Sequence, residues 1–482
     1  MKNRYLYITL LTVLGFHVEL QAQNGPRQLP RIVVSITIDQ LNSDDLEALA
    51  PLYGDKGFRH LLEKGTVYEN ASYPLSHTDR ASAISSLFTG TTPYYHGITG
   101  LRWHDRETLR PVFCTDGQQE GPSPDRLMVS TIGDELKVAT QGRAKVFAIA
   151  PYEDAAILSA GHAADGAIWM DGEKNVWTSS KYYANETPTF VLSHNNLKRE
   201  EYKRDKHRQA SPRVNADVTE LAMRCVSDQM MGYDEVPDLL CLTYHAAAQT
   251  QQPADKRQEE LRDTYIRLDR ELGNLISWLE GRVGAGQVLF ILTGTGYTAS
   301  VAPDYTRYRI PTGTFYINRT VNLLNMFFGA LWGQGRYVEA SFDNQLYLNH
   351  KLLESRRISL SDCAQRAREF VAEMSGVRNV YTALQLKSGD NASLALLRNG
   401  FHPERCGDLL IEVAPGWHLQ NEDTGEDQLV EAPTPCFPII IYGGNARAER
   451  VVTPVSTIQI APTIARAIRI RAPNACTSEP LF

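Results

Sequence analysis

An acidic residue follows a run of apolar residues near the start of the chain, where an enzyme built on a parallel sheet often places a reactive side chain. The run covers residues 31–38, and the acidic residue is Asp39. In open α/β sheets the carboxyl ends of buried parallel strands open into the loops that carry chemistry. A carboxylate at such an end can bind a metal ion, accept a proton or pair with a cation. Asp39 is therefore the first candidate site residue.

A second group of polar residues occurs in the segment His77-Thr78-Asp79-Arg80. His77 and Asp79 could hold one metal ion together with Asp39, but His and Asp are also ordinary turn residues that hydrogen-bond the backbone. Thr78 and Ser82 are possible nucleophiles, yet no pattern places a metal ion or a histidine base beside either one. We favour structural roles for these side chains.

Two further histidines lie next to predicted elements. His162 stands in the segment Gly161-His162-Ala163, and His245 follows an apolar run. A histidine in such a place more often hydrogen-bonds its neighbours or caps a strand than binds a metal. We predict structural roles for both.

The elements that position these residues are indicated by apolar runs bounded by turn residues. Such runs predict buried parallel strands, and they cover residues 32–38, 145–150, 238–244, 288–293 and 438–442. Residues 256–281 form a long amphipathic pattern, with leucines recurring at three- and four-residue spacing on one face. Alternating strands and helices predict an α/β fold with a doubly wound, mostly parallel sheet.

A separate module is predicted between residues 303 and 426. Strands are expected at 345–349, 377–382 and 408–413, and an amphipathic helix at 361–374 with Ser359 or Ser361 as its N-cap. Because the strand at 438–442 resembles the core strands, we interpret residues 303–426 as a cap subdomain inserted into a core made of residues 23–302 and 427–482.

The first 22 residues have the layout of a signal peptide. Lys2 and Arg4 precede an apolar run at 5–16, and Ala22 offers a small residue at the end of the segment, although Leu20 makes the cleavage motif imperfect. The apolar run is short of the roughly 20 residues that span a bilayer, and no comparable run follows. The sequence therefore predicts export to the periplasm or beyond and no transmembrane segment in the mature chain.

Composition limits the partners and the redox chemistry. The 482 residues carry a formal net charge of −7, which argues against a nucleic-acid partner held by phosphate contacts. The 7 cysteines include no CxxC pair, so a zinc ribbon or a thioredoxin motif is not indicated. One or two disulfides are possible in an exported chain, with at least one thiol left over. Cys241, inside an apolar run, is interpreted as a buried small hydrophobe.

Several motifs together resemble a known family. They are Ile38-Asp39-Gln40-Leu41, Gly57-Phe58-Arg59-His60-Leu61-Leu62, Phe88-Thr89-Gly90, His96-Gly97-Ile98-Thr99-Gly100, Ala156-Ile157-Leu158, Leu268-Asp269 and Ile460-Ala461-Pro462-Thr463. The chain resembles the alkaline phosphatase superfamily, in the type I phosphodiesterase and nucleotide pyrophosphatase branch, specifically its exported bacterial threonine-nucleophile phosphatases. The resemblance implies an alkaline-phosphatase type of core with an inserted cap.

In that family two zinc ions clamp the phosphoryl group, and a metal-bound threonine is the nucleophile. The resemblance places these roles on the present chain as follows: the first metal ligand on Asp39, the nucleophile on Arg80, an Asp and a His on Ala248 and Gln252, an Asp-His pair on Thr295 and Gly296, and a last His near Asp427. Only Asp39 keeps a metal-binding side chain at a firmly placed position.

Small errors of register do not restore the missing ligands. Residues 246–253 and 294–303 contain no Asp, Glu, His or Cys. The positions that contact substrate in the family are changed as well, to Leu101, Tyr152 and Asp154. An aspartate in place of a phosphate-binding arginine is expected to repel the substrate.

A buried aspartate without its metal ions is costly unless another cation pairs with it. We therefore predict an Asp39–Arg80 ion pair at the former metal site, with the guanidinium within about 6 Å of the carboxylate. The alternative is that Arg80 points into an open cleft and binds an anion.

Three functions remain open from sequence. The first is a catalytically degenerate exported phosphatase relative that needs no cofactor and serves in binding or scaffolding, with an unknown protein or a small anionic ligand as its partner. The second is a hydrolase of phosphate mono- or diesters that works through a rebuilt site. The third is a structural subunit of an envelope complex.

Overall fold

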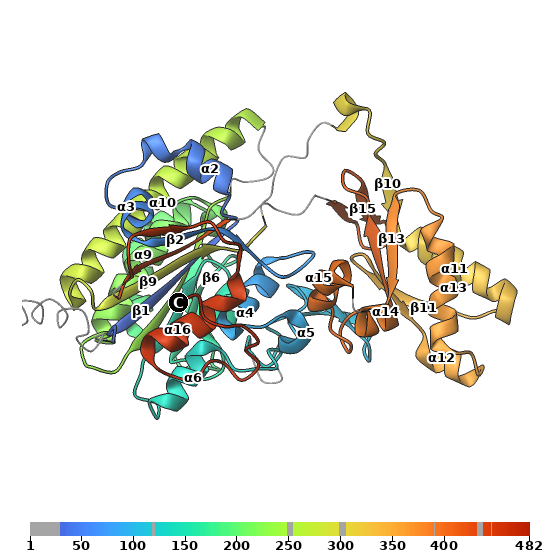
Figure 1. The fold of residues 1–482 in the computed structure, drawn as a ribbon, viewed down its shortest axis with the longest axis horizontal. Helices are drawn as coiled ribbons and strands as arrows, with labels where there is room; N and C mark the ends of the chain where they lie inside the picture. Colours follow the sequence, from blue (N-terminus) through green and yellow to red (C-terminus); the bar gives the residue numbers. More distant parts are fainter. Residues whose placement is uncertain are drawn as a thin grey trace, which may run out of the picture.

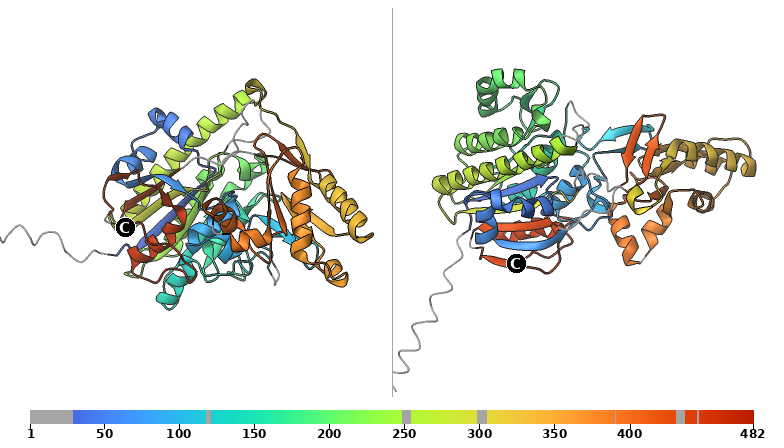
Figure 2. Two further views of the ribbon diagram at one scale, coloured as in Figure 1. Left: turned by 45° about the vertical axis from the view of Figure 1, so that its right-hand side comes forward. Right: turned by 90° about the horizontal axis from the view of Figure 1, so that it is seen from above.

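The computed structural model describes residues 29–117, 121–247, 254–297, 305–389, 391–430, 437–444 and 446–482. The chain forms two lobes that lie side by side, a larger one built on the main sheet and a smaller one formed mainly by residues beyond 305 (Figures 1 and 2). The predicted signal peptide at 1–22 lies outside the described residues.

The main sheet crosses the whole larger lobe. Its strands are β1 (Ile32–Asp39), β2 (Thr66–Ser72), β5 (Val146–Ala150), β6 (Gly166–Asp171), β7 (Val176–Ser179), β8 (Asp238–His245), β9 (Val288–Gly294), β17 (Phe437–Gly443), β18 (Glu449–Val451) and β19 (Val455–Ser456). The order is β18-β2-β17-β9-β1-β8-β5-β6-β7, with β19 also paired to β2. The predicted α/β fold with a mostly parallel sheet is confirmed.

One strand direction differs from the prediction. β9, β1, β8, β5 and β6 are parallel to one another, but β17 runs antiparallel to both β9 and β2. An apolar run that is buried on both faces has the same composition in either direction, so its sequence does not distinguish the two.

Helices cover both faces of the sheet, because alternate side chains of each strand point to opposite faces. One face packs against α2 (Ser43–Ala48), α3 (Phe58–Lys64), α8 (Thr189–Arg204), α9 (Val214–Asp228) and α10 (Ala254–Val283). The other packs against α4 (Arg80–Thr89), α6 (Ile132–Ala139), α7 (Glu153–Ala160) and α16 (Ile460–Ile468), and α5 (Pro93–His96) follows α4. The predicted helix at 256–281 is the central part of α10, in which Leu268, Leu272, Leu275 and Leu279 are buried while Leu261 is partly buried.

The smaller lobe has two sheets and a hydrophobic core of its own. Its elements are β10 (Thr314–Tyr316), α11 (Ile317–Trp332), β11 (Val338–Phe342), β12 (Gln345–Leu348), α12 (His350–Ser355), α13 (Leu360–Ala372), β13 (Val377–Thr382), α14 (Ala383–Ser388), α15 (Ala392–Gly400), β14 (Leu409–Val413), β15 (His418–Asn421) and β16 (Glu426–Leu429). The three strands expected here are present as β12, β13 and β14, and Ser359 caps α13. The helix α11 was not predicted. The boundaries at 303 and 426 remain a prediction, although β16 still belongs to this lobe.

A hairpin from the larger lobe reaches toward the smaller one. It consists of β3 (Arg102–Asp105) and β4 (Arg110–Phe113). Arg102 pairs with Glu426 at 3.1 Å, and the guanidinium of Arg405 donates to the carbonyl of Gly97. These contacts join the hairpin and the loop after α5 to the second lobe.

Two further features bear on the sequence predictions. No helix within the described ranges is both long and apolar enough to cross a membrane. The six cysteines in those ranges are all free thiols, and Cys436 lies outside them. Cys241 is buried in β8, as predicted.

Candidate functional site

The carboxyl ends of the three central strands meet at Asp39. β1 lies between β8 and β9, and the register places Asp39 opposite His245 and Ile38 opposite Gly294. The loop after β9 therefore begins beside the Asp39 carboxylate, which is fully buried. The sheet topology thus assembles a site from segments that are more than 200 residues apart.

Arg80 enters this site from the first turn of α4. Asp79 is the N-cap of the helix and forms a capping box with Ser82, whose hydroxyl donates to the Asp79 carboxylate at 2.7 Å. The same carboxylate accepts the backbone N–H of Leu101 at 2.5 Å. The hydroxyl of Thr78 donates to the carbonyl of Gly296 at 3.1 Å. Asp79, Ser82 and Thr78 therefore have the structural roles expected from the sequence.

The guanidinium of Arg80 pairs with two buried carboxylates. Its Nη1 lies 3.4 Å from Oδ2 of Asp39, which confirms the predicted ion pair. Its closer partner is Asp154: Nε and Nη2 donate to the two carboxylate oxygens at 2.8 and 2.9 Å. Side-chain exposure is only 15% for Arg80, 1% for Asp39 and 7% for Asp154. The alternative in which Arg80 points into an open cleft is wrong.

Asp154 was expected to repel a bound phosphate, which stays a prediction, and the structure shows that it pairs with Arg80. The residue lies in the first turn of α7, and its bidentate contact satisfies both oxygens with the fork geometry that guanidinium groups prefer. Tyr152, the N-cap of α7, places its ring 3.9 Å from the guanidinium carbon of Arg80. Two former substrate positions therefore hold Arg80 from two sides.

The second oxygen of Asp39 is also occupied. Oδ1 accepts the hydroxyl of Thr295 at 3.1 Å and the phenol of Tyr297 at 2.9 Å. The Thr295 hydroxyl in turn accepts the backbone N–H of Gln40 at 2.9 Å. On the Oδ2 side, Nδ1 of His245 lies 3.7 Å away. Asp39 is thus surrounded by protein donors on every described side.

These neighbours hold Asp39 ionised. Burial raises the pKa of the carboxyl group, but the imidazole of His245, the charge of Arg80 and the phenol of Tyr297 outweigh burial and lower the pKa to about 2. Burial lowers the pKa of Arg80, but the charges of Asp154 and Asp39 raise it well above its ordinary value. Asp39 and Arg80 are therefore both charged throughout the neutral range.

The lowered pKa of Asp39 predicts an acid-dependent loss of stability. A group whose pKa is lower in the folded chain stabilises that state above its unfolded pKa, and the benefit disappears as pH falls toward the folded value. Between pH 4 and pH 2 we expect Asp39 to lose about 2 kcal/mol of stabilisation. Urea unfolding of wild type and Asp39→Asn at several pH values measures the difference between them.

That difference is expected to shrink below pH 4 and to stay constant above it. Asp55→Asn, at a carboxylate that is 90% exposed, serves as the control and should differ from wild type by the same amount at every pH. A pH-independent difference for Asp39→Asn would contradict the prediction.

Gly296 has no room for a side chain. Its φ is +76°, and a Cβ atom on it would lie 2.5 Å from Cδ2 of Tyr73. Tyr73 is itself fixed, because its hydroxyl donates to the carbonyl of Gly294 at 3.1 Å and its ring packs against Phe437. Tyr73 thus fills the space that a histidine at position 296 would need.

The remaining predicted residues lie in different places. Ala248 and Gln252 lie outside the described residues. Asp427 belongs to β16 in the smaller lobe, where it accepts from His418 at 2.8 Å, so it does not join the site. His162 contacts Asp134 and the carbonyl of Leu127 at 3.1 and 3.0 Å, the structural role expected of it.

The sequence-based reasoning missed two contributors, Tyr297 and the pairing role of Asp154. The pairing role of Asp154 could have been inferred from the charges, because an arginine beside one buried aspartate readily pairs with another carboxylate. Within the described ranges, no group of three or more His, Cys, Asp or Glu side chains is arranged to hold a metal ion.

Comparisons with known proteins show which proteins the chain is similar to. A model of the type I phosphodiesterase / nucleotide pyrophosphatase family matches residues 33–435. Alkaline phosphatase PafA of Elizabethkingia meningoseptica is 24% identical over 520 residues, with 94% of each chain covered. Alkaline phosphatase PhoV of Synechococcus elongatus is 24% identical over 507 residues, with 92% of this chain and 91% of the relative covered.

A solved structure extends the likeness to the fold. The crystal structure of wild-type PafA superposes with a TM-score of 0.83 at 23% identity, and the match covers 95% of this chain and 99% of that one. The arrangement of sheet, helices and second lobe is therefore that of an alkaline phosphatase.

Proposed function

Because this chain belongs to the type I phosphodiesterase / nucleotide pyrophosphatase family, we propose that it keeps the phosphatase fold but carries an ion-pair network in place of the catalytic centre. On this proposal the protein is a non-catalytic relative that serves in binding or scaffolding. The contact that carries the proposal is the guanidinium of Arg80, held by Asp154 and Asp39, at the position to which the sequence resemblance assigns the nucleophile.

The chemistry of arginine supports this proposal. A guanidinium stays protonated at every physiological pH and has no lone pair to attack phosphorus. The nearby hydroxyls of Thr78 and Ser82 are engaged with the carbonyl of Gly296 and the carboxylate of Asp79. Among the described residues, neither of these two hydroxyls is hydrogen-bonded to a histidine that could act as its base.

The residues around Asp39 do not fit a two-zinc centre. Zinc needs several anionic or imidazole donors, and bringing a cation to Asp39 would set it against the Arg80 charge. At two of the metal-ligand positions implied by the family, Thr295 supplies only a hydroxyl and Gly296 has no side chain. These observations support a site that needs no metal cofactor.

Family membership is also compatible with a phosphoester hydrolase that uses a rebuilt site, so activity must be measured. Zinc content and the hydrolysis of aryl phosphate mono- and diesters are assayed on the purified chain with zinc supplied. We expect far less than one zinc per chain and the same background rate for wild type and Asp39→Ala. Stoichiometric zinc, together with turnover that Asp39→Ala abolishes, would replace the proposal with the hydrolase.

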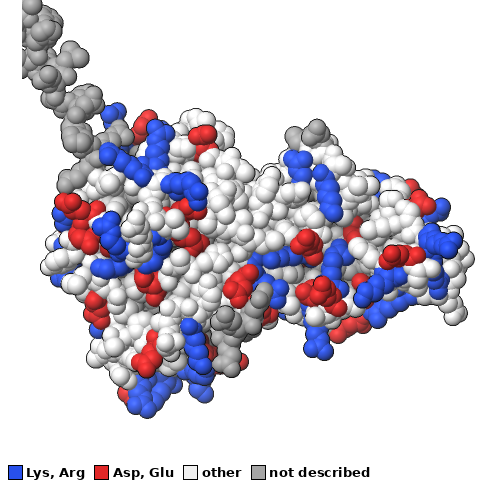
Figure 3. Space-filling view, turned by 90° about the horizontal axis from the view of Figure 1, so that it is seen from below, with Lys and Arg blue, Asp and Glu red and all other residues white. Residues whose placement is uncertain are grey.

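Export is part of the proposal and is supported by the signal-peptide layout of residues 1–22. The surface charge is consistent with a partner other than nucleic acid. In Figure 3, acidic and basic side chains are interspersed over both lobes, with no broad area of positive charge on that face. Nucleic acids are held chiefly through continuous basic surfaces.

A further inference from the structure

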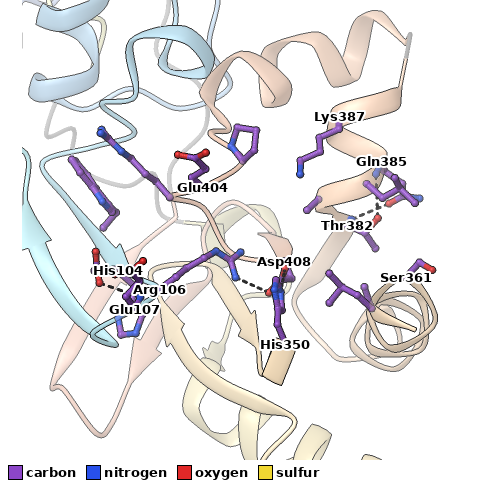
Figure 4. A pocket seen from close by; sticks show the side chains of 18 of the residues that line it. His104, Arg106, Glu107, His350, Ser361, Thr382, Gln385, Lys387, Glu404 and Asp408 are labelled. Carbon is purple, nitrogen blue, oxygen red and sulfur yellow. Dashed lines mark hydrogen bonds and ion pairs between the residues drawn. The ribbon is translucent and has the colours of Figure 1, made fainter. Parts of the chain in front are cut away.

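A cleft of about 970 Å³ lies between the β3–β4 hairpin and the smaller lobe. The hairpin contributes His104 and Arg106 to one wall, and α13 and α14 form the opposite wall (Figure 4). Neither Asp39 nor Arg80 lines this cleft. Its size is that of a pocket for a small organic molecule.

The floor of the cleft is electrically balanced. Asp408 is buried, and its carboxylate accepts Nη1 of Arg106 at 3.2 Å, Nε2 of His350 at 2.9 Å and the N–H of Leu348 at 2.8 Å. Arg106 also donates to the carbonyl of Cys406 at 2.6 Å. This group of residues joins the two lobes. The charges of Arg106 and Asp408 offset each other, so the floor offers a ligand no unpaired charge.

The cations above this floor are different, because they donate hydrogen bonds to backbone carbonyls rather than to carboxylates. Arg405 donates to the carbonyl of Gly97 and lies over the ring of Trp103, with its guanidinium carbon 4.6 Å from the ring centroid. Arg126 donates to the carbonyl of Asp116 at 3.1 Å. Among the described residues, neither arginine forms an ion pair with a carboxylate.

Electrostatics at Arg405 show that this arrangement is unfavourable without an anion. Burial and the neighbouring charge of Arg126 lower the pKa of Arg405 to about 10, and the attraction of Glu404 only partly opposes them. Two half-buried guanidinium groups that repel each other are stabilised when an oxyanion binds between them. Lys387 points from the opposite wall into the space between the walls (Figure 4).

The carboxylates that line the cleft do not cancel these charges. Asp105 is engaged chiefly in the hairpin turn, where it accepts the backbone N–H groups of Glu107 and Thr108 at 3.1 and 2.8 Å, and the charge of Arg126 acts on it only as a smaller contribution. Glu107 and Glu404 are exposed to solvent, which screens their charge. Arg405 and Arg126, which are half-buried, therefore give this part of the cleft a local excess of positive charge.

The rest of the lining is uncharged and about half of it is apolar, the neutral polar residues being Ser359, Ser361, Gln365, Thr382 and Gln385. Leu360 and Ala364 come from α13, Ala383 and Leu384 from α14, and Pro403 from the loop after α15. We infer that this cleft binds a small amphipathic organic anion, whose apolar body packs between α13 and α14 while its carboxylate, sulfonate or phosphate group lies between Arg405 and Arg126. The inference does not depend on whether the Arg80 network is catalytic.

Calorimetric titration of the full chain with naphthalene-2-sulfonate tests this site, and 2-naphthol serves as the neutral probe with the same ring system. We expect the sulfonate to bind at least tenfold more tightly than 2-naphthol. We also expect its affinity to fall as salt is added. Arg405→Gln should weaken sulfonate binding about tenfold or more, which corresponds to about 1.4 kcal/mol. Titrations with 2-naphthoate and 2-naphthyl phosphate then rank the three oxyanions.

Matched variants distinguish a direct effect on binding from an effect on folding. Lys387→Glu changes an exposed lining residue, so it should leave the fold intact and lower the affinity for the sulfonate at least threefold. Arg110→Gln removes an exposed charge from the same hairpin outside the cleft and should bind as wild type does. The inference is overturned by absence of binding at millimolar sulfonate, by equal affinity for the neutral probe, or by wild-type affinity in both Arg405→Gln and Lys387→Glu.

Discussion

An Arg80→Met variant is expected to lose about 3–5 kcal/mol of its free energy of unfolding, because removing one partner of a buried ion pair leaves uncompensated charge. Here the two carboxylates left behind, Asp39 and Asp154, are 1% and 7% exposed. Methionine keeps most of the volume of the side chain, so the loss reports charge rather than an empty cavity. Urea unfolding at neutral pH, with the slope checked for constancy, measures the effect.

Neutralising the carboxylates should restore much of the loss. The triple variant Arg80→Met, Asp39→Asn, Asp154→Asn removes the buried charges along with the cation, and we expect it to be more stable than Arg80→Met alone. Such a recovery is typical of buried ion pairs, whose desolvation cost often matches their attraction. Failure of the triple variant to recover would mean that Arg80 acts through packing against Tyr152 rather than through charge.

Two other arginines calibrate the measurement. Arg208 forms a buried bidentate pair with Asp217 at 2.8 and 2.9 Å, so Arg208→Met should destabilise the chain by a similar amount away from the site. Arg59 pairs with Asp55 on the surface, and Arg59→Met should change stability by less than about 1 kcal/mol. If Arg80→Met behaves like Arg59→Met, the network does not hold the site together.

Much of the fold could be predicted from the sequence, because apolar runs and leucine spacing directly reflect burial. The strands β1, β8 and β9 and the helix α10 were located within two residues of their observed ends. The helix α11 was missed because its exposed face also carries apolar side chains such as Leu323 and Met326, which obscures the helical pattern.

The candidate site could be predicted only in part. The pairing of Asp39 with Arg80 followed from the cost of a buried unpaired charge, which a sequence can indicate once the strand end is known. The contacts with Asp154 and Tyr297 join residues 74 and 258 positions apart along the chain. Which side chain reaches which carboxylate depends on loop conformation and rotamers, and neither is encoded in a local pattern.

Gly296→His is expected to destabilise the chain by about 2–5 kcal/mol. The new Cβ would lie 2.5 Å from Cδ2 of Tyr73, and overpacking of this kind costs about 1–3 kcal/mol. The left-handed backbone at φ +76° adds about 1–2 kcal/mol for a residue with a side chain. Thermal or urea unfolding of the variant, compared with wild type, measures the sum.

Gly286→His separates these two costs. Gly286 has a similar φ of +84°, but a Cβ atom on it would meet no other atom within 4 Å, so its substitution carries only the backbone cost. The excess loss in Gly296→His over Gly286→His is therefore the clash with Tyr73. Equal losses would show that Tyr73 moves aside freely.

A large excess loss of stability in Gly296→His would show that Tyr73 excludes a histidine from position 296. Because Tyr73 is hydrogen-bonded and its ring packs against Phe437, a histidine is expected to fit at position 296 only after Tyr73 has been replaced by a smaller residue. The Tyr73→Ala, Gly296→His pair should then be less destabilised than the sum of its single variants. A histidine at position 296 is therefore expected to need a second change at Tyr73, so the space filled by Tyr73 limits which side chains this loop can carry beside Asp39.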